Sequence, residues 1–162
     1  MRIVKLNVLM NKEKLPMLVK EQTVLYKNLS EITSGEDVAQ IMTDVFFMDR
    51  KITEEIYLIA INNRGKPIGF FQLNKGCIDN CIIDVRGMMI MLLLCNASSF
   101  IIVHNHVSGE IIPSKDDCKV TERVKHTAEI MGIGFLDHII IGDNYQYFSF
   151  YENIWSKEDG RT

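Results

Sequence analysis

The sequence predicts an α/β fold with a mixed sheet, of the α+β kind, because helix-like and strand-like patterns alternate along its 162 residues. Two observations support this prediction. Runs such as "IYLIAI" and "FIIV" have the β-branched and aromatic character of strands, and between them apolar residues recur at helical spacing. The hydrophobic share of 47% and the charged share of 24% are ordinary for a globular chain of this length, which suffices for one core.

The N-terminal part, residues 1–33, is expected to form an extension that contains strands. Apolar and polar residues alternate weakly from Val4 to Val8, as in a half-buried strand. The segment "TVLYK" (23–27) has the composition of a partner strand for it. We therefore expect this extension to contribute a strand pair.

A helix and a hairpin are expected next. Ser34 has the side chain of a helix N-cap, with acidic residues in the turn that follows. Farther on, the strand-like runs "EEIYLIAI" and "PIGFFQL" flank "NNRGKP", whose Asn, Gly and Pro favour a tight turn. A polar loop from Gly76 to Asp84 should follow this β-hairpin.

The middle of the chain carries its most apolar segment. "RGMMIMLLLCN" is apolar nearly all round, so we expect a buried helix. "FIIV" (100–103) is a short continuous apolar run, as in a central strand that is buried on both faces. Although no charged side chain lies between Arg86 and His104, "NASS" interrupts the run, and a membrane span needs ~20 apolar residues. We therefore expect no membrane span.

The last third of the chain predicts a helix and two strands. Ser114 and Gly132 are typical of the residues at which a helix begins and ends. The strand "FLDHIIIG" and its partner "YQYFSF" should follow. Within the helix, the apolar positions predicted to form the buried stripe are Val120, Val124, Ala128 and Met131.

The charge of the chain bears on its binding partners, and its cysteines and N-terminus bear on its cellular compartment. The net charge of −3 gives no electrostatic reason to expect direct nucleic-acid binding. The N-terminus lacks the apolar core and cleavage site of a signal peptide, so we expect a cytoplasmic protein whose four cysteines are reduced thiols. Cys77 and Cys81 have zinc-ligand spacing, but no second pair follows, which argues against a structural zinc site.

The stretch "HNHVSGEIIPSKDD" predicts a functional site. If strand geometry persists to its end, His104 and His106 project to the same side. Asp117 lies three residues before Val120, on the side of the helix that should face inward, where an aspartate needs a partner. A metal ion bound by two imidazoles and a carboxylate would satisfy all three.

Two histidines and one carboxylate would leave the fourth coordination position of a zinc ion open for water, as in catalytic zinc sites. Non-haem iron also accepts such ligands. The alternative is that both histidines are polar loop residues and that Asp117 only caps its helix. The joint occurrence of His-x-His at a strand end and Ser-x-x-Asp at a helix start favours the site.

The same stretch fits the JAMM metalloprotease pattern, in which His-x-His is followed after seven residues by Ser-x-x-Asp, and it resembles the RadC branch of that superfamily. The resemblance extends through "EEIYLIAINN", "HTAEIMGIGFLDHIIIGD" and "YFSF". It implies a JAB/MPN-like fold with the three-layer architecture of the cytidine deaminases. The corresponding domain would span residues 34–155, followed by a tail of residues 156–162.

This resemblance also implies roles for individual residues. His104, His106 and Asp117 would hold Zn²⁺, and Ser114 would stabilise the tetrahedral intermediate. Glu54 would be the general base in the hydrolysis of a peptide or isopeptide bond of a peptide or protein substrate. The neighbouring Glu55 stays open as the alternative base, because Ile56 replaces the aromatic residue that usually follows the glutamate by two positions.

Two other functions remain as hypotheses. The RadC family is associated with DNA repair, so a repair- or mobile-element-associated role is the first. We expect too few residues before Ser34 for a helix-hairpin-helix-like region, which weakens direct DNA binding. A non-catalytic interaction module is the second, and retention of every candidate ligand argues against it.

Four residues depart from the pattern or invite a further role. Val107 replaces the usual proline, which should only loosen the loop, and Cys77 replaces a small hydroxyl residue. His138 could lie beside a metal ligand, but a partly buried histidine whose hydrogen bonds are satisfied is the favoured interpretation. His126 should be solvated on the polar side of its helix.

Overall fold

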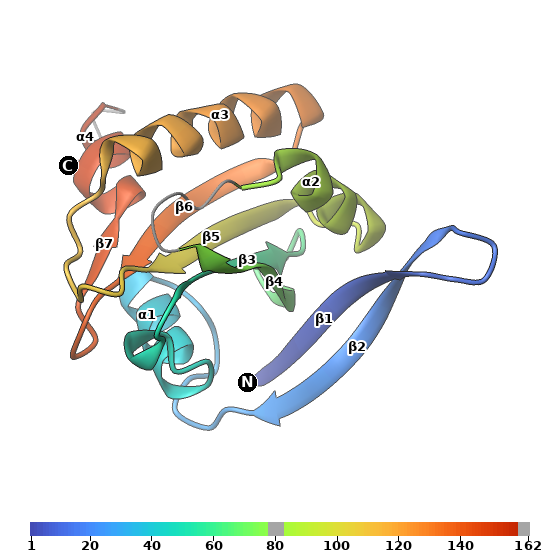
Figure 1. Cartoon of the computed structure of the whole chain (residues 1–162), viewed down its shortest axis with the longest axis horizontal. Helices are drawn as coiled ribbons and strands as arrows, with labels where there is room; N and C mark the ends of the chain where they lie inside the picture. The colour runs from blue at the N-terminus through green and yellow to red at the C-terminus, as the bar shows by residue number, and fades with distance from the viewer. Residues whose placement is uncertain (78–82, 159–162) are drawn as a thin grey trace.

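A mixed seven-stranded sheet forms the centre of the protein, with the strand order β2-β1-β4-β3-β5-β6-β7 (Figure 1). The computed structural model describes residues 1–77 and 83–158. The strands are β1 (Arg2–Met10), β2 (Pro16–Leu25), β3 (Glu54–Ile61), β4 (Pro67–Cys77), β5 (Ser99–Asn105), β6 (Gly134–Ile141) and β7 (Tyr147–Ser149).

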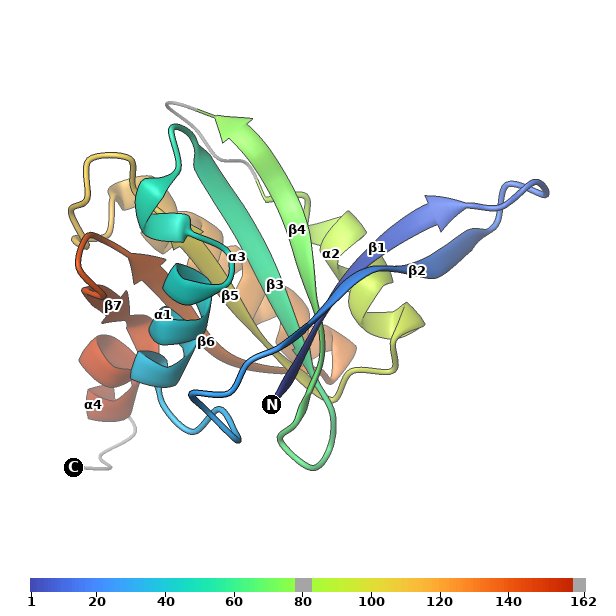
Figure 2. The same ribbon diagram turned by 90° about the horizontal axis from the view of Figure 1, so that it is seen from below.

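Helices cover both faces of this sheet. The face that carries α1 also carries the 3₁₀ turn η1, and α2 and α3 cover the opposite face (Figures 1 and 2). These layers confirm the predicted α/β class with a mixed sheet and a JAB/MPN-like fold. The helical elements are α1 (Gly35–Asp44), η1 (Met48–Arg50), α2 (Val85–Leu94), α3 (Lys115–Met131), the π-helical turn η2 (Tyr151–Trp155) and α4 (Ser156–Glu158).

The two central strands, β3 and β5, explain the continuous apolar runs in the sequence. Each is buried on both faces, and their side chains alternate between two clusters. Tyr57 and Ile59 pack toward α1, whereas Leu58 and Ile102 pack toward α2 and α3. The prediction of a doubly buried strand at 100–103 is therefore confirmed.

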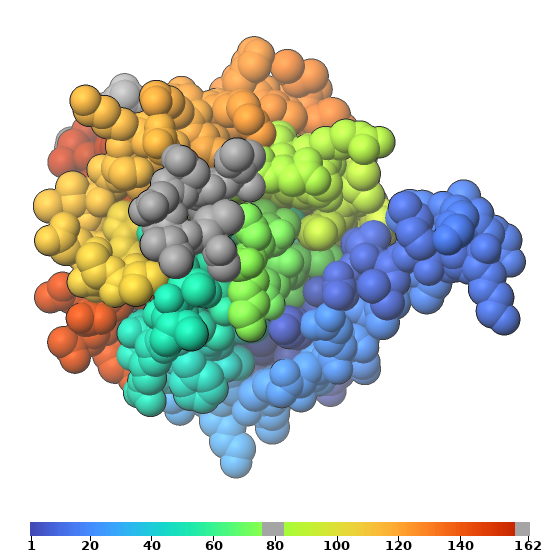
Figure 3. All heavy atoms as spheres, viewed as in Figure 1, coloured from blue at the N-terminus to red at the C-terminus, as the bar shows by residue number. Residues whose placement is uncertain are grey.

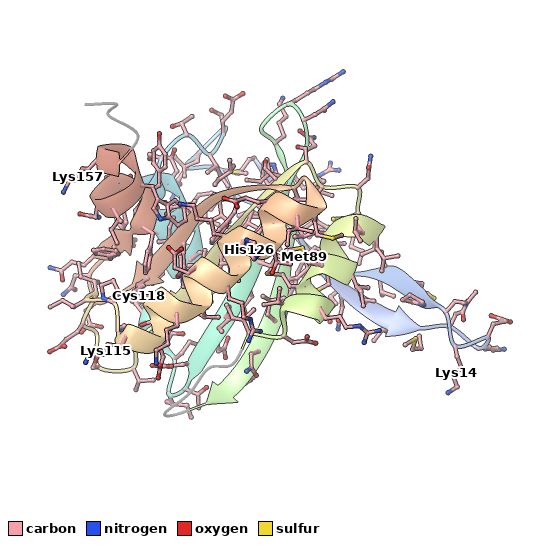
Figure 4. The ribbon with its side chains drawn as sticks, turned by 90° about the horizontal axis from the view of Figure 1, so that it is seen from above. Lys14, Met89, Lys115, Cys118, His126 and Lys157 are labelled. Carbon is pink, nitrogen blue, oxygen red and sulfur yellow. The ribbon has the colours of Figure 1, made fainter. Side chains whose placement is uncertain are left out.

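The N-terminal strand pair is a long hairpin. β1 and β2 are antiparallel, with Ile3 opposite Val24, so the predicted partner strand is present and is longer than expected. β1 joins the sheet through a short parallel pairing in which Lys5 lies opposite Phe70. The tip stands apart from the body (Figure 3), with Lys14 near its end (Figure 4).

The helix ends follow the capping chemistry of the sequence. Ser34 and Ser114 each accept a hydrogen bond from the backbone N–H three residues later, and an aspartate at that position closes a capping box. Gly132 ends α3 with a φ of 66°, a left-handed conformation that glycine adopts without strain. The hairpin turn between β3 and β4 also has its glycine, Gly65, at positive φ.

Two predictions about burial were wrong. α2 is not buried all round, because only one side contacts the sheet: Leu92 is fully buried, whereas Leu93 is 55% exposed. In α3, Met131 is 41% exposed, since it lies at the end of the helix beyond the main contact with the sheet. Thr121, which the sequence did not indicate, is 1% exposed and lies in the buried stripe beside Val124.

Some expectations fall outside the described part of the chain. Most of the polar loop expected from Gly76 to Asp84, including Cys81, lies there, as do residues 159–162 of the expected tail. Cys77 ends β4, but its side chain lies outside the description as well. Among the helices of residues 1–77 and 83–158, none is both long and apolar enough to cross a membrane.

Candidate metal centre

The two histidines lie where β5 ends, as the sequence predicts. His104 pairs with Ile56 of β3 on one side and with Ile140 of β6 on the other, and it is 3% exposed. Strand geometry continues through Asn105, so His104 and His106 project to the same side. Their Nε2 atoms are 3.1 Å apart.

Asp117 reaches the same point from the first turn of α3. Its Oδ1 lies 3.1 Å from Nε2 of His104, and its Oδ2 lies 3.4 Å from Nε2 of His106. Oδ2 also accepts hydrogen bonds from the backbone N–H and the hydroxyl of Ser114. The two sequence interpretations of Asp117, helix cap and metal ligand, are therefore compatible in one side chain.

The hydrogen bond behind His106 determines what its ring presents to the centre. Nδ1 of His106 lies 2.8 Å from the carbonyl oxygen of Glu110, which can only accept. In the neutral ring the proton is therefore on Nδ1, and Nε2 carries a lone pair. This lone pair faces the carboxylate of Asp117, a second acceptor. A proton or a cation placed between two such groups relieves their repulsion.

The electrostatics agree with a cation site. Hydrogen bonding to Asp117 raises the pKa of His106 above its ordinary value, and the charge of Glu54 adds to this shift. Burial alone would raise the pKa of Asp117, but hydrogen bonds with the two histidines and Ser114 hold it well below its usual range. Metals bind neutral imidazole and ionised carboxylate, so a metal ion would take the place of the proton shared here.

The ligand atoms of His104, His106 and Asp117 lie within 4.8 Å of one another. Two imidazole nitrogens and one carboxylate oxygen are accepted by zinc and by non-haem iron. The group can therefore hold a metal ion through three protein ligands. Lys115 and Cys118 mark the nearby end of α3, whereas His126 lies exposed farther along this helix, as predicted (Figure 4).

The two candidate bases lie on opposite faces of β3. Glu55 is 2% exposed and points toward the α1 face, where its carboxylate contacts Lys51, Gln72 and Tyr57 at 3.3, 2.9 and 3.3 Å. Glu54 shares its face with Ile56, the residue paired with His104. Of the two carboxylates, Glu54 is thus the one on the side of the metal centre.

Ser114 is held by the capping box. Its hydroxyl donates to Oδ2 of Asp117 at 2.6 Å, and its Oγ accepts from the backbone N–H of Asp117 at 3.1 Å. Ser114 therefore lies beside a candidate ligand and is exposed to solvent. The role implied by the sequence, donation to a substrate oxyanion, would require its hydroxyl hydrogen to leave Asp117.

Asn105, which stands between the two histidines, was not identified from the sequence. Its side chain is 1% exposed and points to the opposite face, where Oδ1 accepts from the backbone N–H of Glu55 at 2.9 Å. Its Nδ2 donates to the carbonyl of Thr53 at 3.3 Å. Asn105 thus holds the chain on both sides of Glu54. A buried asparagine in a strand requires hydrogen-bond partners, and this requirement could have identified Asn105 from the sequence.

The prediction that His138 is partly buried was wrong: it is 1% exposed, and its two ring nitrogens have partners, one of which is the candidate ligand His104. Its Nε2 lies 2.9 Å from Nδ1 of His104, and its Nδ1 lies 2.6 Å from Oγ1 of Thr121. Burial lowers the pKa of His138 well below its ordinary value, so the ring is neutral. Thr121 was missed altogether, since nothing in the sequence indicates that it meets a histidine seventeen positions away.

The layered fold, with a His-x-His and aspartate group at a strand end that could hold a metal ion, defines a domain of the JAB/MPN type. Residues 32–155 match the sequence model of the family described as "RadC-like JAB domain", and the chain belongs to this family. Site residues and family match therefore point to the same part of the chain.

Relatives with the name UPF0758 protein support this assignment. The protein from Flavobacterium johnsoniae is 38% identical over 122 residues, which are 75% of this chain and 52% of that protein. Those from Clostridium perfringens and Thermotoga maritima are 37% and 34% identical, over 70% and 75% of this chain and 49% and 53% of their own lengths. The chain spans about half the length of these relatives, and their names state no activity.

Proposed function

We propose that this protein is a zinc-dependent hydrolase that cleaves amide bonds, in peptides or in isopeptide linkages, with water as the nucleophile. The observation that carries the proposal is the convergence of His104, His106 and Asp117 at the end of one buried strand. Three protein ligands leave a position for water, as in catalytic zinc sites, whereas structural zinc sites have four.

The reaction needs a proton carrier besides the metal. A bound zinc ion would supply a water of lowered pKa and a Lewis acid for the substrate carbonyl. Glu54 takes a proton from the attacking water and delivers it to the leaving amine. The position of Glu54 on the His104 face of β3, while Glu55 is engaged on the other face, supports this role.

Ser114 is proposed to stabilise the oxyanion that forms when water attacks the carbonyl. Its hydroxyl hydrogen then turns from Asp117 to the substrate oxygen, a rotation about one bond. The backbone N–H of Asp117 keeps its hydrogen bond to Oγ during this rotation. Ser114 therefore needs no movement of the main chain to act.

Metal analysis tests the centre. Purified wild type should hold about one zinc ion per chain, and His104→Ala and Asp117→Ala should lose it. His126→Ala removes an exposed histidine of α3 and should keep the metal. Wild type without stoichiometric metal, or His104→Ala with it, would overturn the proposal.

A second experiment tests the reaction. Zinc-loaded protein is incubated in isotopically labelled water with a mixture of linear peptides and peptides linked through a lysine side chain. Mass spectrometry should find products whose new carboxylates carry the label, and the Asp117→Ala protein should give none. Absence of labelled products from every peptide of either linkage would overturn amide hydrolysis while leaving the metal centre intact.

A further inference from the structure

A chain of three buried contacts connects one candidate ligand with the main chain of another. Nδ1 of His104 lies 2.9 Å from Nε2 of His138, and Nδ1 of His138 lies 2.6 Å from Oγ1 of Thr121. Oγ1 of Thr121 lies 2.6 Å from the carbonyl oxygen of Asp117. The three side chains are between 1% and 3% exposed, so water cannot exchange with these hydrogen bonds freely.

The direction of every hydrogen bond in this series follows from its final acceptor, the carbonyl oxygen of Asp117. The carbonyl of Asp117 only accepts, so the single hydroxyl hydrogen of Thr121 is donated to it. Oγ1 of Thr121 must then accept from Nδ1–H of His138. The ring of His138 is buried and stacked on Phe150, with centroids 5.0 Å apart, and it stays neutral. It has one N–H, so its Nε2 accepts from Nδ1–H of His104.

This direction determines the state of His104. With its proton on Nδ1, the lone pair of Nε2 faces Asp117 and His106, each 3.1 Å away. The reverse direction would place a proton on Nε2 and block metal binding. The carbonyl of Glu110 imposes the same tautomer on His106 by a separate contact.

We propose that His138 and Thr121 are positioning residues that hold His104 in its metal-binding tautomer, with the Thr121 hydroxyl setting the direction of the hydrogen bonds. The proposal rests on the metal centre of the proposed function but not on amide hydrolysis. Hydrogen bonds behind metal-binding histidines raise metal affinity by about 10- to 100-fold. If the hydrogen bonds were purely structural, removing one of them would change the stability of the fold without changing the tautomer of His104.

Thr121→Val is the decisive variant, because it keeps the shape of the side chain and removes the hydroxyl. His138 then loses the acceptor that fixes its proton on Nδ1. Thr121→Ser retains the hydroxyl and should restore wild-type behaviour. Thr127→Val is the matched control, since Thr127 also donates to the carbonyl four residues earlier on α3, at 2.8 Å, and within the described residues its hydroxyl forms no hydrogen bond with a histidine.

Two measurements test the proposal. Competition with a chelator at fixed pH should show zinc affinity about 10- to 100-fold weaker for Thr121→Val, and within about threefold of wild type for Thr121→Ser and Thr127→Val. A long-range proton–nitrogen correlation spectrum of metal-free protein at pH ~8, above the ordinary histidine pKa of ~6.5, should show His138 with its proton on Nδ1 in wild type and on Nε2 in Thr121→Val.

The outcomes separate this proposal from the metal centre itself. If wild type binds no zinc, the metal centre fails, and the spectrum of metal-free protein still tests the hydrogen-bond direction. If Thr121→Val binds zinc as tightly as wild type, or if wild-type His138 carries its proton on Nε2, the positioning role is overturned while the metal centre stands. Thermal unfolding of each variant without metal confirms that the fold is retained.

Discussion

The side chain of Asn105 accepts a hydrogen bond from the backbone N–H of Glu55 across the paired strands β5 and β3. Asn105 separates the two candidate metal ligands in the sequence, and Glu55 follows the candidate base. One side chain therefore ties the strand end that carries His104 to the strand start that carries Glu54. The spacing between the candidate metal ligands and the candidate base depends on this connection.

Asn105→Ala should reduce stability and turnover together. It leaves the N–H of Glu55 and the carbonyl of Thr53 without their partner, at a cost of about 1–3 kcal/mol in the free energy of unfolding. Turnover should fall while zinc stays stoichiometric, because the strand that carries Glu54 is no longer held. Urea unfolding and peptide hydrolysis measure the two effects. Asn153→Ala, which removes a comparable bond to Ser149 at the C-terminal turn, should lower stability alone, and an equal loss of turnover there would contradict the argument.

Glu54→Gln and Glu55→Gln should separate the two faces of β3. Glu54→Gln should bind zinc normally and lose turnover by about 10²- to 10⁴-fold, the usual contribution of a general base. Glu55→Gln weakens the ion pair with Lys51 on the opposite face, so it should lower stability and keep turnover. Zinc analysis and initial rates decide the matter, and a dead Glu55→Gln with an active Glu54→Gln would assign the base one residue later.

Ser114→Ala should be compared with Ser34→Ala, since both serines cap a helix with the same pair of capping-box hydrogen bonds. Each substitution should lower the free energy of unfolding by about 1 kcal/mol. Only Ser114 lies beside a candidate metal ligand, so only Ser114→Ala should also lower kcat. Steady-state kinetics and thermal unfolding report these effects, and equal kcat values for the two variants would leave Ser114 as a helix cap without a catalytic part.

The convergence of the three candidate metal ligands was predictable because their geometry is local. Residues two apart in a strand share a side, and Asp117 lies at a capping position that a short sequence pattern defines. Placing Glu54 rather than Glu55 on the His104 face of β3 required the pairing of β3 with β5 as well as strand alternation, and the sequence alone does not specify that pairing.

His138 and Thr121, which support the candidate ligands, were not predictable because their contacts are not local in the sequence. His138 meets His104 only because β5 and β6 pair in parallel, and Thr121 meets His138 only because α3 packs on that strand. The exposure of Leu93 was missed because an apolar composition says nothing about how much of a helix the sheet covers. Contacts between distant segments, rather than element types, were the missing information.

Asp137 should make stability depend on pH. This carboxyl is 7% exposed, and burial raises its pKa to about 6, although hydrogen bonds from Ser149 and Tyr151 oppose the shift. An unfolded aspartate titrates near ~3.9. The folded state therefore binds the proton more tightly, so this contribution to stability is fully present below pH ~4 and is lost as pH rises through about 6.

Asp137→Asn removes this titration, so its stability relative to wild type should rise by up to about 3 kcal/mol between pH ~4 and pH ~7.5. Taking the difference between the two proteins cancels the other titrating groups, and urea unfolding at each pH measures it. Ser149→Ala is the informative companion, because it removes the hydrogen bond that lowers the pKa of Asp137 and should shift the transition to higher pH. Parallel stability curves for wild type and Asp137→Asn across this range would show that the folded and unfolded states bind the Asp137 proton equally, and thus that its hydrogen bonds offset its burial.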